Sequence, residues 1–150
     1  MLVTDYLKQN AERYGDETAL VERDPTAGSR RTLTWAAFDR QADRLAGFLA
    51  GRFDGPGQPV VHLMTNCLEW LPVYFGILRS GAVAVPLNFR FDAEEILRCV
   101  QIAEARVVIF GEEFIDRVTA IKPDLDRTVG LYVFAGSAGR RPGFARLLED

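Results

Sequence analysis

Short runs of apolar, largely β-branched residues alternate with amphipathic stretches through the second half of the chain. The runs predict strands, and the stretches with apolar residues three or four positions apart predict helices. Strands are expected at 60–64, 82–87, 106–110 and 128–134, and helices at 67–79, 92–103 and 112–121. The strand runs do not alternate between apolar and polar residues, which is typical of parallel strands buried on both faces. The pattern predicts an α/β fold of βαβ units, with a mainly parallel sheet flanked by helices.

The first third of the chain has a different pattern. Thr4 is expected to cap a short first helix. Two strand candidates, 17–22 and 31–33, lie on either side of a turn-rich loop and predict a short irregular strand pair. Thr34 is then expected to cap a long helix with one apolar face.

Length and composition predict a single domain, because 150 residues of which 48% are hydrophobic can bury one core. Within it, residues 1–58 hold the helix, the strand pair and the long helix, and residues 59–134 hold the βαβ units. Residues 135–150 are expected to form a loop or tail, with one helical turn at 144–148.

Charge, hydropathy and the two cysteines limit the partners and the location that the sequence leads us to expect. The net charge of −3 gives no reason to expect a nucleic-acid ligand. The longest apolar run, 70–78, is too short to span a bilayer, and no signal segment opens the chain. Cys67 and Cys99 lack the spacing of a paired motif, so reduced thiols and a cytoplasmic location are expected. The oligomeric state stays open.

The segment SGAVAVPLNFRFDAEE, residues 80–95, joins a strand to a helix. We expect its first half to be a buried parallel strand inside the sheet, with Pro86 at its carboxyl end, because proline cannot donate to a ladder. Asn88 is interpreted as a turn residue. Phe89 and Phe91 are expected to pack onto the sheet.

Two helix starts have the spacing of a capping box. Asn66 precedes Glu69 by three positions, and Asp92 precedes Glu95 by three. In that spacing each side chain can bond the other residue's backbone N–H. Helix initiation is therefore the interpretation of all four residues.

No complete active site can be assembled from these residues. The single histidine, His62, lies in the middle of a strand and is interpreted as a core or sheet-end residue. No histidine or cysteine pair suggests a metal site, and no glycine-rich phosphate motif occurs. No catalytic residue and no metal ligand is therefore assigned.

Residues 64–110 nevertheless resemble the amino-terminal part of the adenylate-forming (AMP-binding) superfamily, which includes acyl-CoA synthetases, peptide-synthetase adenylation domains and luciferases. The matching elements are Asn66 with Glu69, residues 81–83 leading to 86–88, the acid-rich helix start after them, and the strand at 105–109. Upstream, ETALVERD and RTLTWAAFDRQADRLAGFLAGR resemble the family's early strand pair and first long helix. The resemblance covers about residues 4 to 134.

The resemblance implies a parent enzyme that is an AMP-forming carboxylic acid–CoA ligase, acting on a small acid through an acyl-adenylate, as in fatty acid metabolism. ATP, Mg and CoA would be its cofactors. The family's phosphate loop and catalytic lysine are not among these 150 residues. The chain is therefore expected to be an amino-terminal subdomain fragment that is inactive alone, binds no cofactor by itself and has the rest of the parent chain as its partner.

The resemblance also implies a role for Arg90, as a contact to a CoA phosphate. A solvated loop arginine is the alternative. Two other readings of the whole chain stay open: a stand-alone flavodoxin-like binding or interaction module, and a fragment of a peptide-synthetase adenylation domain. The identity of the acid is not indicated.

Overall fold

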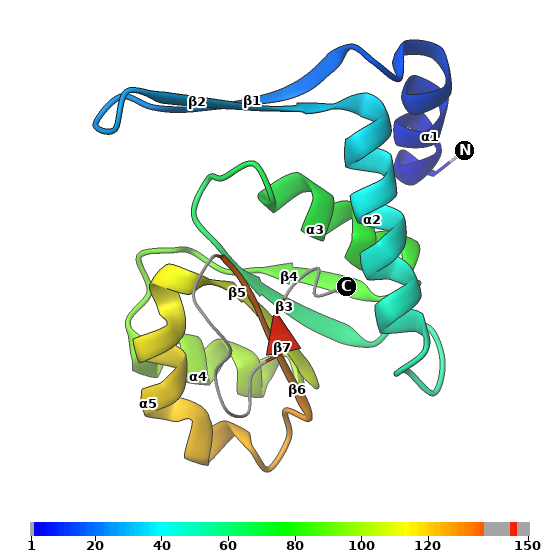
Figure 1. Ribbon diagram of the computed structural model, residues 1–150. Helices are drawn as coiled ribbons and strands as arrows, with labels where there is room; N and C mark the ends of the chain where they lie inside the picture. Colours follow the sequence, from blue (N-terminus) through cyan, green and yellow to red (C-terminus); the bar gives the residue numbers. More distant parts are fainter. Residues whose placement is uncertain (1, 137–144, 147–150) are drawn as a thin grey trace. The chain divides into compact units, whose positions relative to one another are not determined.

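The computed structural model describes residues 2–136 and 145–146 (Figure 1). The chain divides into two compact units. The first consists of Met1–Arg52 and Asn66–Ser80, and the second of Phe53–Thr65 and Gly81–Asp150. The single-domain organisation expected from the sequence stays a prediction. None of the helices in the described part is both long and apolar enough to cross a bilayer.

The first unit contains three helices and a β-hairpin. Its elements are α1 (Val3–Tyr14), β1 (Thr18–Asp24), β2 (Ser29–Thr34), α2 (Trp35–Ala50) and α3 (Trp70–Arg79). In Figure 1 the hairpin extends as a ribbon away from α1 and α2. Its strands are antiparallel, with a register shift between Thr18 and Leu20. This confirms the irregular strand pair.

The caps of the first two helices had different outcomes. Thr34 Oγ1 accepts the Ala37 N–H at 3.2 Å, as expected for the cap of α2. The prediction that Thr4 caps α1 was wrong, because α1 already begins at Val3. The Asp5 carboxylate accepts the Leu2 N–H at 2.7 Å, and this bond starts the helix before Thr4.

The core of the first unit joins helices to the hairpin. Leu7, Leu33, Phe38 and Ala42 are buried together. Helices α2 and α3 approach closely at Gly76, where an added Cβ would lie 2.8 Å from Leu45 Cβ. Only a glycine leaves room for that approach.

The second unit is built on a five-stranded parallel sheet. Its strands are β3 (Pro59–Leu63), β4 (Val83–Pro86), β5 (Val107–Gly111), β6 (Leu131–Ala135) and β7 (Ala145–Arg146). Their order across the sheet is β4-β3-β5-β6-β7. Helices α4 (Ala93–Ile102) and α5 (Ile115–Leu125), the latter preceded by a 3-10 turn at Glu112–Phe114, lie on the same side of the sheet in Figure 1. The parallel α/β fold is confirmed.

The core of the second unit lies between the sheet and these two helices. It consists mainly of alternate residues of three strands and the inward faces of α4 and α5: Val61, Leu63, Val108, Phe110, Tyr132, Phe134, Ile96, Val100, Phe114, Ile115, Val118, Ile121 and Leu125. Every residue of β5 is buried. This is why its sequence shows no polar alternation.

Strand β4 departs from the expectation. It is parallel and ends at Pro86, as predicted, but it lies at the edge of the described sheet rather than inside it. Val83 is 50% exposed as a result. Strand β3 pairs with β4 on one side and with β5 on the other, so β4 has a neighbour on one side only among the described strands. The apolar sequence of β4 does not distinguish an edge position from an interior one.

The end of the chain also differs. Ala145 and Arg146 pair in parallel with Val133 and Phe134, where a helical turn at 144–148 was expected. Backbone pairing to β6 outweighs the weak local helix signal there. The other residues of that turn lie outside the described part.

Candidate functional site

The turn between β4 and α4 carries Arg90, the residue for which the sequence suggests a binding role. Asn88 Oδ1 accepts the N–H of Arg90 at 3.0 Å, and the carbonyl of Asn88 accepts the N–H of Phe91 at 3.1 Å. Asn88 is therefore a turn residue, as expected. These bonds fix the backbone on both sides of the Arg90 side chain.

Arg90 itself is exposed. Its guanidinium carbon lies 5.5 Å from the centroid of the Phe89 ring, and it forms no ion pair with any residue of the described part. Phe89 is 43% exposed, so its expected packing onto the sheet was wrong, whereas Phe91 does pack against the core. The Phe89 ring instead lies within cation–π distance of the Arg90 guanidinium.

The start of α4 follows this turn directly. Asp92 Oδ1 accepts the Glu95 N–H and Glu95 Oε2 accepts the Asp92 N–H, both at 2.9 Å. The predicted capping box is confirmed. The turn is thus anchored at one end by β4 and at the other by a fixed helix start.

A second arginine, which the sequence did not reveal, contacts the same turn. Arg117 of α5 donates from Nη1 to the carbonyls of Phe89 (3.1 Å) and Phe91 (3.0 Å). Its guanidinium carbon lies 5.3 Å from the centroid of the Phe114 ring. No local pattern could have indicated these bonds, because the partners are 26 and 28 residues apart.

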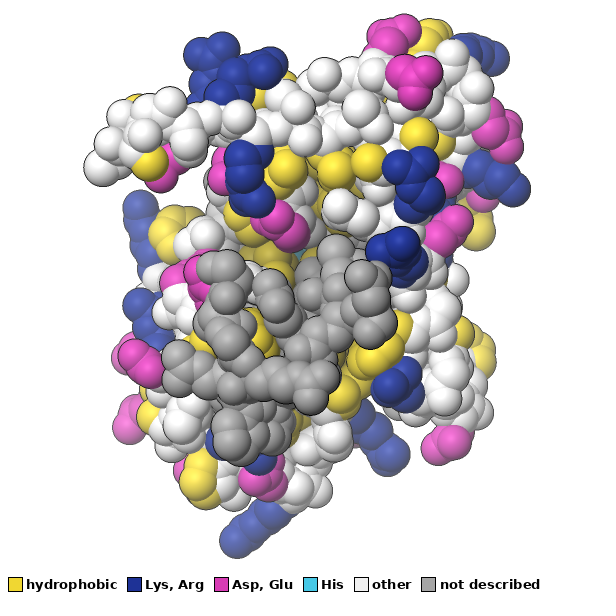
Figure 2. All heavy atoms as spheres, viewed as in Figure 1, with side chains coloured by type: hydrophobic (Ala, Val, Ile, Leu, Met, Phe, Trp, Pro, Cys, Tyr) yellow, Lys and Arg dark blue, Asp and Glu magenta, His cyan; other side chains and the backbone are white. Residues whose placement is uncertain are grey.

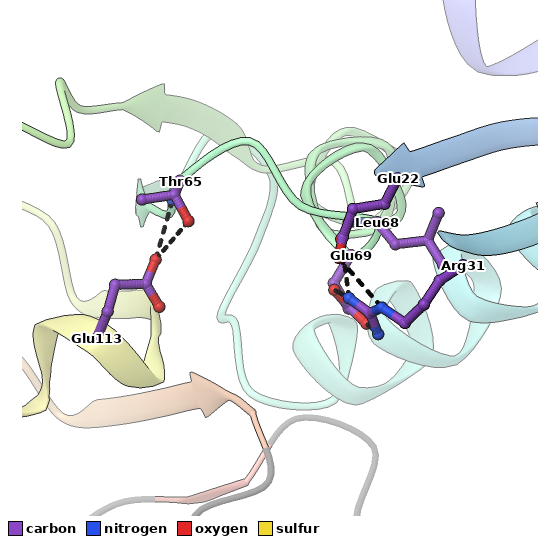
Figure 3. Close-up of polar contacts among 6 residues, drawn as sticks. All are labelled: Glu22, Arg31, Thr65, Leu68, Glu69 and Glu113. Atoms are coloured by element: carbon purple, nitrogen blue, oxygen red, sulfur yellow. Dashed lines mark hydrogen bonds and ion pairs between the residues drawn. The ribbon is translucent and has the colours of Figure 1, made fainter. Parts of the chain in front are cut away.

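The carboxyl ends of β3 and β5 form a topological switch point, because the chain continues from β3 to β4 on one side and later to β5 on the other. Open α/β sheets commonly bind ligands at such points. Here Glu113 Oε1 accepts the backbone N–H of Thr65 at 3.1 Å and its hydroxyl at 2.7 Å (Figure 3). The bonds join the two strand ends, and they assemble no nucleophile with a base.

His62 does not supply that base. It is completely buried on β3, with Nε2 3.2 Å from Met64 Sδ. Burial lowers its pKa to about 4, so the imidazole is neutral at neutral pH. The interpretation as a core residue is confirmed.

A groove of about 330 Å³ lies in the first unit. It is lined by Leu20, Val21, Glu22, Arg23, Asn66, Cys67, Leu68, Trp70 and Leu71. Arg31 of β2 bridges Glu22 (2.8 Å) and Glu69 (2.9 Å), and Glu22 accepts the Leu68 N–H at 2.6 Å (Figure 3). The hydrogen bond from Arg31 lowers the pKa of Glu22.

This network explains why the prediction of a capping box at Asn66 and Glu69 was wrong. Helix α3 begins only at Trp70, after a turn in which the Trp70 N–H donates to the Cys67 carbonyl. The Glu69 carboxylate is bound by Arg31 and is not hydrogen-bonded to the backbone N–H of Asn66. A charge-assisted pair outweighs the local cap.

Metal-ligating and thiol side chains are the other candidate chemical groups in the described part of the chain. No group of three or more potential metal-ligating side chains occurs among those residues. Cys67 and Cys99 are free thiols, and burial raises the pKa of Cys67 to about 11. Among the described side chains that Figure 2 colours, acidic and basic groups are interspersed and form no continuous basic surface.

Known proteins resemble the chain over most of its length. The family model described as AMP-binding enzyme matches residues 7–140. Long-chain-fatty-acid–CoA ligase FadD13 of Mycobacterium tuberculosis H37Rv is 32% identical over 111 residues, which are 73% of this chain and 22% of that protein. The structure of the anthranilate CoA ligase AuaEII with anthranoyl-AMP superposes with a TM-score of 0.82 at 27% identity, covering 95% of this chain and 26% of that one.

A relative of a different kind is Uncharacterized protein Rv1549 of Mycobacterium tuberculosis H37Rv. It is 31% identical over 107 residues, which are 69% of this chain and 61% of that protein. Against the curated ligases, by contrast, this chain spans about a fifth of their length. Since the family model covers nearly all of the described residues, the chain belongs to the AMP-binding enzyme family.

Proposed function

We propose that this chain is the amino-terminal part of an ATP-dependent carboxylic acid–CoA ligase, and that Arg90 contacts a phosphate of CoA. The observation that carries the second part is the exposed guanidinium of Arg90, which projects from a hydrogen-bonded turn and pairs with no carboxylate of the described residues. The matched relatives that are named as CoA ligases support the first part.

The proposed reaction has two steps. A carboxylate oxygen of the acid attacks the α-phosphorus of ATP and pyrophosphate leaves. The CoA thiol then gives up its proton, its sulfur attacks the acyl carbonyl, and AMP leaves; magnesium would neutralise charge on the phosphates of ATP. None of the residues described above is assigned to making or breaking these bonds, so the 150-residue chain is expected to be inactive alone. Fatty acids are one substrate class consistent with the name of FadD13. A cytoplasmic location stays a prediction.

The residues of the turn fit a phosphate. A guanidinium offers paired N–H donors that match two phosphate oxygens, and Arg90 has none of them engaged by an acidic residue of the described chain. The Phe89 ring beside the guanidinium restricts its movement without neutralising its charge. Arg90 would therefore bind and orient CoA rather than take part in the chemistry.

The test separates the two steps in the full-length protein. Arg90→Ala should raise the KM for CoA about 5- to 30-fold, because a partly exposed charge-assisted contact contributes about 1 to 2 kcal/mol. Acid-dependent ATP–pyrophosphate exchange should remain near the wild-type rate, since it precedes CoA entry. Arg98, an exposed arginine of α4, is the matched control. Equal damage to both steps would make Arg90 structural, and an unchanged CoA KM would make it a solvated loop residue.

A second candidate is a stand-alone α/β binding or interaction module. The observation that favours it is Rv1549, of which the match makes up 61%, so the same fold also occurs in a much shorter protein than the ligases. The reading frame beyond Asp150 discriminates: continuation into a Ser/Thr/Gly-rich loop with lysine supports the ligase. A peptide-synthetase adenylation domain would instead show acid-dependent exchange without use of free CoA.

A further inference from the structure

We infer that Arg117 is a positioning residue that holds the turn at residues 88–91 in the conformation that presents Arg90. The inference rests on the proposed role of Arg90 for its consequence in CoA binding. Its structural part stands on contacts within the second unit alone, namely the two hydrogen bonds from Arg117 Nη1 to the carbonyls of Phe89 and Phe91.

These two carbonyls flank Arg90 on either side. The N–H groups of Arg90 and Phe91 are already bound by Asn88, through its side chain and its carbonyl. Arg117 binds the carbonyls of Phe89 and Phe91, so both N–H donors and carbonyl acceptors of the turn are hydrogen-bonded. A turn held in this way loses little additional entropy when a ligand binds Arg90.

Arg117 is itself anchored. It lies three positions after Phe114, a residue that is 2% exposed, and its guanidinium carbon is 5.3 Å from the centroid of that ring. Residues three apart on a helical segment lie on the same side, so the buried ring directs the arginine towards the turn. A lysine at this position could donate to a carbonyl, but it lacks the planar guanidinium and the several N–H donors of an arginine.

The first measurement is amide hydrogen exchange of residues 88–92 in the full-length protein. Arg117→Met should accelerate exchange there about 10-fold, Arg117→Lys should give an intermediate rate, and Arg98→Met should leave the wild-type rate. Unchanged exchange in Arg117→Met would overturn the positioning role whatever Arg90 does.

The second measurement is the KM for CoA in single and double variants. Arg117→Met should raise it about 3- to 10-fold with a smaller change in kcat, and Arg117→Lys should recover part of the loss. If Arg117 acts through Arg90, the variant Arg90→Ala/Arg117→Met should have a CoA KM no higher than Arg90→Ala. Multiplicative effects would overturn the inference and assign Arg117 a contact of its own.

The two measurements distinguish failure of this inference from failure of the proposed function. Accelerated exchange in Arg117→Met together with an unchanged CoA KM in Arg90→Ala would refute the role of Arg90 and retain the control of the turn by Arg117. A raised CoA KM in Arg90→Ala with wild-type values throughout for Arg117→Met would retain the role of Arg90 and refute that of Arg117.

Discussion

Glu113 accepts two hydrogen bonds from Thr65 through one carboxylate oxygen, from the backbone N–H at 3.1 Å and from the hydroxyl at 2.7 Å. Thr65 lies two residues after the end of β3, and Glu113 lies in the 3-10 turn after β5. The pair therefore ties together the carboxyl ends of two neighbouring parallel strands. Gly111 leaves room for this carboxylate, because an added Cβ there would collide with it.

Loss of this pair should loosen the end of β3. Glu113→Ala should cost about 1 kcal/mol of unfolding free energy and accelerate amide exchange at Thr65, whereas Glu113→Gln retains a carbonyl acceptor and should cost less. Thr65→Val removes only the hydroxyl bond. A double-mutant cycle of Glu113→Ala and Thr65→Val by urea unfolding should give a coupling of about 0.5 to 1 kcal/mol for the hydroxyl bond, and full additivity would show that this hydroxyl bond contributes nothing.

Removal of Arg79 should destabilise the first unit strongly. Arg79 donates to the Asp39 carboxylate (2.5 Å), the Asp43 carboxylate (2.7 Å) and the Thr4 carbonyl, and so joins three helices. Its side chain is 13% exposed. Arg79→Met should lower the unfolding free energy by about 2 to 3 kcal/mol, because Asp39 is left without its partner.

The matched comparison is Lys122→Met, which removes a more exposed ion pair to Asp126 four residues away on the surface of α5. That change should cost about 0.5 kcal/mol. Equal costs for the two variants in urea unfolding would contradict the structural role of Arg79.

The same substitution at two glycines should have opposite effects. Gly76→Ala places a Cβ 2.8 Å from Leu45 Cβ and 3.0 Å from the Ala42 carbonyl oxygen, so it should destabilise by about 1 to 2 kcal/mol despite better helix propensity. Gly47→Ala, in α2, points into open space and should stabilise by up to about 1 kcal/mol. Thermal unfolding of both variants checks the sign, and a stabilised Gly76→Ala would refute the close approach of α2 and α3.

His62 should make stability depend on pH in the acidic range. Its pKa is lowered by burial from 6.5 to about 4, so between these values the unfolded chain binds a proton that the folded chain does not. Stability is therefore highest above pH 6.5 and falls as the pH approaches 4, by about 3 kcal/mol from this group.

Urea unfolding between pH 4 and 8 checks this, with His62→Gln as the comparison that lacks the titrating ring. The acidic groups of the chain also titrate in this range, and the difference between the two proteins isolates His62. Parallel pH profiles for the two proteins would refute the assignment.

Much of the architecture follows from local sequence. The strands of the parallel sheet are apolar on both faces, and that pattern arises because residues such as those of β5 are buried throughout. The caps at Thr34 and at Asp92 with Glu95 were predictable because each side chain bonds a backbone group only three residues away. Pro86 likewise marks the end of β4, since it cannot donate to a ladder.

The tertiary structure decided what depends on distant partners. The edge position of β4 follows from the order of strands across the sheet, which its own apolar residues do not encode. The Glu69 carboxylate, expected to cap a helix, instead accepts a hydrogen bond from Arg31, 38 residues away. Glu113 likewise accepts a hydrogen bond from Thr65, 48 residues away. Arg90 was visible in the sequence as an arginine in a turn. The contacts of Arg117 with that turn exist only because the fold brings the start of α5 beside the segment that precedes α4.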